Sequence, residues 1–276
     1  MRKTIAAGAV AGFVLAAGFA APAQAISATS ADLSVLHGIP GLTVDVYVNG
    51  ALTLDDFEPG DLAGPLDLPA GSYEINVTAS DAADDSAPVL TATVDLAAAT
   101  SYTATANLTE AGEPALNLFT NDTATTKAGE GRLTVRHVAA APAVDILAGG
   151  APVVSSLVNP DQATLNLPVG TVSAAVALAG TTAPVIGPAD VPVEDGKLTI
   201  VYAWGSAADA NLAVAVQSIT VGHSTPGGVN SGTAGYAAER DAMNQAFGII
   251  GIAFAAAAAS VAVFMSRRSR ALKIDS

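Results

Sequence analysis

The sequence predicts an all-β protein of two tandem antiparallel immunoglobulin-like β-sandwiches, followed by one C-terminal transmembrane helix. Three observations lead to this prediction. Short segments alternate apolar and polar residues, the whole pattern occurs twice, and a long uncharged apolar segment lies near the end of the 276-residue chain. Neither copy of the pattern has a convincing stripe of apolar residues at helical spacing, which favours strands.

Alternation with a period of two indicates the strands. Residues 44–48 read Val-Asp-Val-Tyr-Val, residues 73–79 read Tyr-Glu-Ile-Asn-Val-Thr-Ala, and residues 102–108 read Tyr-Thr-Ala-Thr-Ala-Asn-Leu. Such alternation places one face of a strand on a core and the other toward water. Asn49-Gly50 predicts a two-residue hairpin between neighbouring strands. We count seven or eight strands in each copy, a spacing typical of a sandwich.

Internal repetition sets the number of domains. Five blocks recur in the same order: Leu33–His37 as Leu133–His137, Val44–Val46 as Val144–Ile146, Leu66–Gly71 as Leu165–Gly170, Ser101–Leu108 as Lys197–Trp204, and Leu116–Leu118 as Leu212–Val214. The offset between the blocks drifts from 100 to 96 residues. Blocks in a constant order with a drifting offset predict two copies of one domain. We expect each copy to fold alone around its own core.

The full division of the chain follows from these blocks and from its two ends. It comprises a signal peptide (1–25), a first β-sandwich (26–121), a linker (122–130), a second β-sandwich (131–220), a flexible stalk (221–245), a transmembrane helix (246–265) and a cytoplasmic tail (266–276). Five glycines and one proline between residues 222 and 235 are the reason for predicting a stalk.

The N-terminus has the features of a secretory signal peptide. Arg2 and Lys3 precede an apolar, uncharged segment from Ile5 to Ala21, and Ala23-Gln24-Ala25 has the small-x-small pattern of a signal peptidase site. We expect cleavage after Ala25.

The C-terminal segment has the length and flanks of a membrane span. Residues Ala246 to Met265 carry no charge, and about 20 apolar residues cross the hydrocarbon core as a helix. Four basic residues follow the segment: Arg267, Arg268, Arg270 and Lys273. Basic residues concentrate on the cytoplasmic side. We therefore expect a single-pass protein in the cell membrane, with its N-terminal ectodomain outside and its C-terminus in the cytoplasm.

Composition excludes several classes of function. The chain has no cysteine, which excludes disulfides and Cys-ligated zinc. A Cys-free, Ala-rich exported chain of this length favours a bacterial origin. The formal net charge is −14, and residues 26–121 hold 14 acidic residues with no Lys or Arg. A field of this sign repels phosphate, so we expect no nucleic-acid partner.

The histidines and acidic groups are the candidates for chemistry. His37 and His137 occupy equivalent places, at the end of an apolar face, while His223 lies in the predicted stalk. We interpret the repeated pair as structural, held by Asp45 and Asp145 or by loop backbone, because a metal or catalytic site needs convergent ligands.

Two acidic groups could offer oxygen ligands to calcium. They are Asp55-Asp56-x-Glu58-x-x-Asp61 and Asp81-x-x-Asp84-Asp85. Neither has the spacing of a calcium-binding loop, so a solvated loop is favoured. Hydrolase and nucleotide motifs are absent from the sequence. We therefore predict no catalytic, cofactor-binding or metal-binding residue, no cofactor and no enzyme activity.

The opening of each copy carries a family resemblance. The first copy reads His37-Gly-Ile-Pro-Gly-Leu-Thr-Val-Asp45-Val, and the second reads Arg136-His137-Val-Ala-Ala-Ala-Pro142-Ala-Val-Asp145-Ile. Together with a later Pro-x-Gly in each copy, these motifs resemble the bacterial surface family known as domain of unknown function 4397. The first copy departs from the family pattern because Leu36 stands where a basic residue is usual. The acidic loop residue often found between the Pro and the Val is absent from both copies.

The resemblance implies a secreted or anchored sandwich module and no established activity. The sequence thus predicts a non-enzymatic, membrane-anchored bacterial cell-surface protein that acts in adhesion, envelope organisation or binding of a partner. An extracellular receptor module for a small molecule or glycan is the alternative. The expected partners are the membrane, through the C-terminal helix, and a protein or glycan outside the cell.

Overall fold

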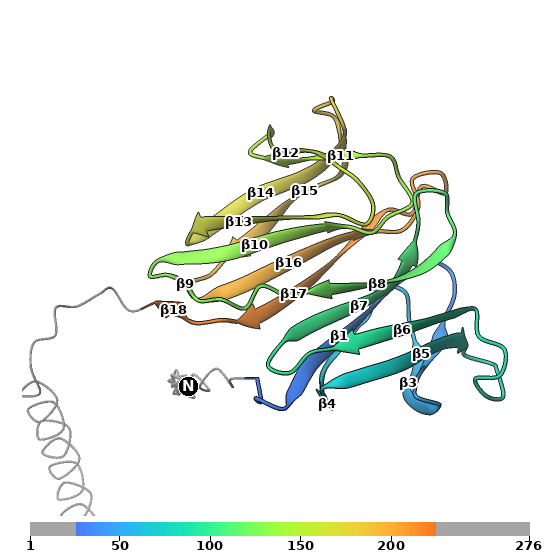
Figure 1. Cartoon of the computed structure of the whole chain (residues 1–276). Helices are drawn as coiled ribbons and strands as arrows, with labels where there is room; N and C mark the ends of the chain where they lie inside the picture. Colours follow the sequence, from blue (N-terminus) through green and yellow to red (C-terminus); the bar gives the residue numbers. More distant parts are fainter. Residues whose placement is uncertain (1–25, 225–276) are drawn as a thin grey trace, which may run out of the picture. The chain divides into compact units, whose positions relative to one another are not determined.

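The computed structural model describes residues 26–224, in which the regular elements are strands (Figure 1). This all-β architecture confirms the predicted fold class at its coarser level. Within these residues there is no helix that is long and apolar enough to cross a membrane. The predicted signal peptide, transmembrane helix and cytoplasmic tail lie outside the described residues, as does the predicted stalk from residue 225 onward.

The first copy consists of eight strands in two four-stranded sheets. The strands are β1 (Ser30–Gly38), β2 (Val44–Val48), β3 (Ala51–Phe57), β4 (Leu62–Pro69), β5 (Gly71–Ala79), β6 (Leu90–Leu96), β7 (Ser101–Leu108) and β8 (Pro114–Thr120). One sheet has the order β4-β1-β7-β8 and the other the order β3-β2-β5-β6. Asn49 and Gly50 have positive φ at the hairpin between β2 and β3, as the Asn-Gly pair predicts.

The second copy repeats this topology. Its strands are β10 (Glu130–His137), β11 (Val144–Ala148), β12 (Ala151–Leu157), β13 (Gln162–Pro168), β14 (Gly170–Leu178), β15 (Pro184–Val193), β16 (Lys197–Trp204) and β17 (Ala213–Thr220). Their sheets have the orders β13-β10-β16-β17 and β12-β11-β14-β15. The expectation of purely antiparallel sheets is wrong, because β1 pairs with β7, and β10 with β16, in parallel.

Each copy has a core between its two facing sheets, as in a β-sandwich. Leu33 and Val35 on one sheet of the first copy pack with Val46, Ile75 and Val77 on the other. The second copy has a smaller cluster of the same kind, made of five buried residues: Val135, Val144, Ile146, Leu157 and Val176.

Strand pairing corrects the alignment of the two copies. Leu33 pairs with Tyr102, and Leu133 pairs with Thr199, so the equivalent of Tyr102 is Thr199. The sequence match had placed Leu198 there, at an offset of 96 rather than 97. A shift by one residue moves a side chain to the other face of a strand. Tyr102 accordingly belongs to the core of the first copy, whereas Leu198 faces away from the core of the second.

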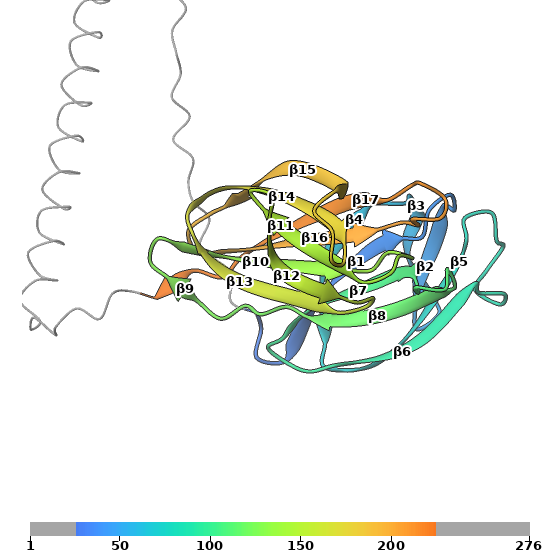
Figure 2. The ribbon, with the colours of Figure 1, turned by 90° about the horizontal axis from the view of Figure 1, so that it is seen from above.

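The faces expected to meet water are buried where the two copies meet. Every residue of β7 is buried, and the side chains of Thr103, Thr105 and Asn107 are fully inaccessible. The sequence prediction that these polar residues face solvent is therefore wrong. Strands β1 and β7 of the first copy lie beside β16 and β17 of the second (Figure 1 and Figure 2), and side chains join them.

Apolar clusters also cross between the copies. Leu36 and Phe119 of the first copy pack with Val138, Tyr202 and Trp204 of the second. Trp204 lies so close to Gly60 that a Cβ there would stand 2.9 Å from its ring. Burying a large apolar side chain contributes roughly 1.5–3 kcal/mol. Each copy therefore has its own core and also contributes to an apolar cluster shared with the other copy.

The linker is held against the second copy. Strand β9 (Thr126–Lys127) pairs in parallel with β18 (His223–Ser224), which joins the linker to the end of the described chain. The Arg132 guanidinium donates to the carbonyl oxygens of Asp122 and Ala124, both at 2.7 Å. These contacts fix the segment that connects the two copies.

Because the copies share buried clusters, we predict that they unfold together. Differential scanning calorimetry of the full-length chain should give one transition for the β-structure, with equal calorimetric and van't Hoff enthalpies. Two separate transitions, each assigned to one copy, would show that the shared clusters contribute little to stability.

Candidate functional site

The repeated histidines are buried and hydrogen-bonded to their own loops. His37 and His137 are each 1% exposed. The Nε2 atom of His37 lies 2.6 Å from the carbonyl oxygen of Leu42, and that of His137 lies 3.1 Å from the carbonyl oxygen of Pro142. A carbonyl oxygen only accepts, so Nε2 carries the proton in both rings. Each ring therefore ties the loop after β1 or β10 back to its strand.

Burial also sets the charge state of both rings. Desolvation lowers the pKa of His37 and of His137 below the ordinary value of 6.5, although the loop carbonyls oppose the shift. The Nδ1 atom of His37 has no hydrogen-bond partner. The Nδ1 atom of His137 accepts a hydrogen bond from the backbone N–H of Ala139 at 3.5 Å. A neutral ring whose Nε2 atom is bonded to its own loop suits a structural clamp.

The repeated aspartates have partners of their own, separate from the histidines. Asp45 Oδ1 accepts a hydrogen bond from the backbone N–H of Asp56 at 2.9 Å, and Asp145 Oδ1 accepts one from that of Ser156 at 2.8 Å. Both donors have positive φ, 51° for Asp56 and 57° for Ser156, where the ladder between two strands shifts register. The carboxylate thus stabilises a β-bulge in each copy. Asp145 Oδ2 additionally accepts from Gly180 N–H at 2.8 Å.

One acidic group converges, but not in the pattern suggested by the sequence. Carboxylate oxygens of Asp45, Asp55 and Asp56 lie within 4.8 Å of one another, which is the only such group among the residues that the structure describes. Glu58 and Asp61 do not join it. The second copy has serines at the equivalents of Asp55 and Asp56, so the group is not a shared feature. Asp55 and Asp56 are exposed, but they lie in strand β3 rather than in the expected loop.

The second acidic group has local partners. Asp84 Oδ1 accepts from the backbone N–H of Ser86 at 2.9 Å, and these hydrogen bonds to Ser86 lower the pKa of Asp84. Asp85 accepts from the Asn76 amide at 3.3 Å. These bonds order the loop after β5.

A buried polar network between the copies was not foreseen from the sequence. Arg136 donates through Nη1 to the Tyr202 hydroxyl at 2.8 Å, and that hydroxyl donates to Gln217 Oε1 at 2.6 Å. Gln217 donates through Nε2 to Ser34 of the first copy at 3.0 Å and accepts from Thr103 at 3.1 Å. None of the side-chain nitrogen and oxygen atoms in this network lacks a hydrogen-bond partner, as a buried network requires.

Arg136 is the cation at one end of this network. It is 1% exposed, and its Nε and Nη2 atoms donate to the side-chain oxygens of Gln162 at 2.8 Å and Asn121 at 2.9 Å. Its guanidinium lies 4.4 Å from the centre of the Phe119 ring, a favourable geometry for a cation–π contact. Burial lowers the pKa of Arg136, but arginine remains charged in proteins.

Residues 31–147 match the family model described as domain of unknown function (DUF4397). The matched segment covers the first copy from β1 onward, the linker, and the opening strands β10 and β11 of the second copy. It therefore includes both His–Asp motifs.

No curated protein matches the chain. A solved structure that matches is "The Bacillus anthracis TIE protein", which is 16% identical over 64% of this chain and 34% of that chain, with a TM-score of 0.21. The chain thus spans about a third of that protein. A likeness at this level carries no inference about function.

We predict that His37→Ala destabilises the protein by roughly 1–3 kcal/mol, because a buried polar interaction is lost. His137→Ala should have an effect of similar size. Chemical denaturation of the full-length chain measures both. His223→Ala is the matched control, since the His223 side chain is 47% exposed and its loss should change stability by less than about 0.5 kcal/mol. Equal stability of all three variants would mean that the loop clamps contribute nothing.

The two histidines also predict a pH dependence of stability. As the pH falls below 6.5, the unfolded chain binds protons on these rings before the folded chain does, because the folded pKa values are lowered. The free energy of unfolding should therefore decrease from pH 7 toward pH 5. Denaturation curves at several pH values measure this decrease. The double variant His37→Asn, His137→Asn should show a flatter dependence, and an equal slope in both proteins would contradict the assignment.

Proposed function

We propose that this chain is a non-enzymatic, membrane-anchored bacterial cell-surface protein whose two copies act as one rigid body outside the cell. The interface between the copies carries the proposal. Arg136, Gln217 and Trp204 of the second copy are buried against the first, and the linker is pinned by Arg132. An ectodomain in which two sandwiches are fused in this way holds its loops in a fixed geometry. Such a scaffold suits adhesion, envelope organisation or display of a binding surface to a partner.

The family assignment of the second copy is part of the proposal. We take it to be a second domain of the DUF4397 type, with immunoglobulin-like sandwiches in both copies. Its support is the identical strand order of the two copies and the same pair of clamps, His137 with Pro142 and Asp145 with Ser156. The bacterial origin is supported by the composition of the chain and by the family that its motifs resemble.

The location is proposed from the ends of the sequence. The Ala-x-Ala site before Ile26 supports export, and the uncharged segment 246–265 with the basic residues after it supports a single membrane span. The −14 net charge supports a protein or glycan partner rather than nucleic acid.

A receptor for a small molecule is the second candidate. A specific observation favours it, namely an apolar cavity in the second copy. The cavity has no aromatic residue in its lining, so it lacks the stacking surface that a sugar ring would use. This observation favours an apolar ligand over a glycan.

Limited proteolysis of intact cells tests the proposed topology and the rigid pair together. We predict that the mature protein begins at Ile26 and that protease releases one fragment containing both copies, cut C-terminal to Ser224. Mass spectrometry identifies the ends of the fragment. An intact Met1 or a protected ectodomain would contradict the topology, whereas cleavage between residues 122 and 130 into single copies would contradict the rigid pair.

Pull-down with the full-length protein against envelope fractions then seeks the partner.

A further inference from the structure

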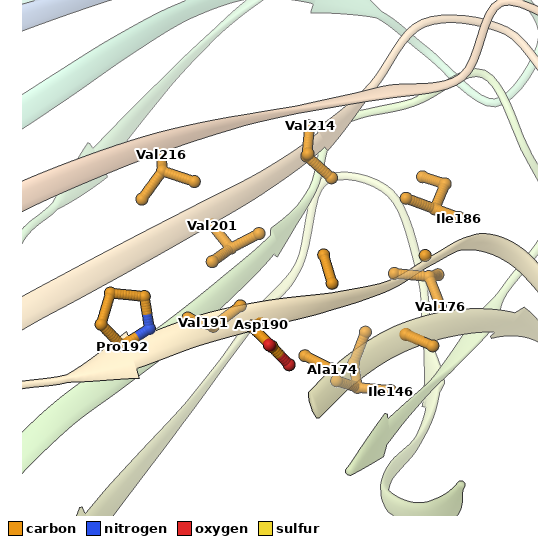
Figure 3. Close-up of a pocket in the computed structure, with 13 residues that line it drawn as sticks. Ile146, Ala174, Val176, Ile186, Asp190, Val191, Pro192, Val201, Val214 and Val216 are labelled. Atoms are coloured by element: carbon orange, nitrogen blue, oxygen red, sulfur yellow. The ribbon is translucent and has the colours of Figure 1, made fainter. Parts of the chain in front are cut away.

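The second copy contains an apolar cavity that the first copy lacks in this form. The cavity has a volume of about 130 Å³ and lies between the two sheets, on the side of β15 and β17 (Figure 3). Val201, Val214 and Val216 line it from one sheet, and Ala174 and Val191 line it from the other. Val214 and Val216 are 43% and 53% exposed, so the cavity is open to solvent at this side.

Strand pairing identifies the residues that fill the same place in the first copy. Val48 pairs with Ile75 and Ala148 pairs with Ala174, so Ile75 is the equivalent of Ala174. Ile75 is 1% exposed and belongs to the core of the first copy. Because alanine has three carbon atoms fewer than isoleucine, Ala174 leaves space in the middle of the second copy's sandwich that Ile75 fills in the first.

The side chains at the rim of the cavity are also smaller in the second copy than in the first. Ala104 pairs with Leu118 and Val201 pairs with Val216, which makes Leu118 the equivalent of Val216. By the same register Leu116 is the equivalent of Val214. Both leucines pack against the core of the first copy, whereas the two valines remain largely exposed. The second copy therefore lacks the side chain that fills this space in the first copy, and it lacks the two larger side chains at the rim.

The lining restricts what could bind. It is almost wholly aliphatic, and Asp190 is its only charged residue (Figure 3). A cavity with so few polar partners holds water poorly, and an engineered apolar cavity of about 150 Å³ in another protein binds benzene. A carboxylate at the lining disfavours an anionic ligand.

We propose that this cavity is a binding site for a compact, uncharged hydrocarbon molecule of about the size of benzene or a short branched alkane. Burial of apolar surface drives the binding, and the shape of the gap left by Ala174 sets the size limit. This inference rests on the second candidate function, the receptor for a small molecule, and it is independent of the surface role proposed above.

Methyl NMR of the full-length chain in lipid nanodiscs tests this proposal, with benzene as the probe. Benzene should shift the valine methyl signals of Val201, Val214 and Val216 in a saturable manner. Ala174→Ile introduces the residue that the first copy has at the equivalent position, which should fill the cavity and abolish the shifts. Val216→Leu narrows the opening and should weaken binding at least several-fold. Ser173→Ala is the matched control, because Ser173 lies on the same strand but does not line the cavity.

The outcomes separate the alternatives. Loss of saturable shifts in Ala174→Ile, with a well-dispersed spectrum and with Ser173→Ala unaffected, supports the site. Benzene partitions into the nanodisc equally for all variants, so non-specific uptake would shift the signals of every variant alike and overturn the proposal. The absence of saturable shifts in the unmodified chain would also overturn it. Because protease accessibility on cells is measured separately, failure here leaves the proposed topology intact.

Discussion

The burial of Arg136 between the two copies is the constraint on which the rest of the structure depends. A guanidinium taken out of water is costly unless its donors are satisfied. Here the acceptors come from both copies, since Gln162 and Tyr202 belong to the second and Asn121 follows the last strand of the first. The charge can be accommodated only when the copies are docked. The network therefore fixes their arrangement as well as contributing to its stability.

The same interface accounts for the asymmetry in the repeated opening motif. The equivalent positions are Leu36 and Arg136, and both side chains are buried at the interface rather than exposed. Two arginines here would place two buried positive charges in one interface, where like charges repel strongly. With leucine in one copy and arginine in the other, the interface has an apolar part and a polar part instead. The leucine at position 36 thus has a physical reason in the docked pair.

The two copies share a framework and differ in what surrounds it. In each, the histidine clamps the loop after the first strand, and the aspartate stabilises a bulge one hairpin later. These contacts are local, so each copy can retain them whatever the other does. The core has diverged instead, with Ile75 in the first copy and Ala174 in the second. At this position the first sandwich is filled by a side chain, whereas the second has an open apolar cavity.

The sequence by itself determined the all-β class, the doubling and most strands, because period-two alternation and the Asn49-Gly50 turn are local signals. It also placed His37 and His137 on the apolar face of their strands. It could not show that Thr103 and Thr105 are buried, because a strand has the same alternation of residues whether its polar face contacts water or another polar surface. For the same reason it could not show that Arg136 donates to Asn121 and Gln162. The sequence also did not show the one-residue register shift at Tyr102 or the cavity beside Ala174. Register and cavity volume depend on which strands pair and what packs across them, and only the tertiary structure decided these.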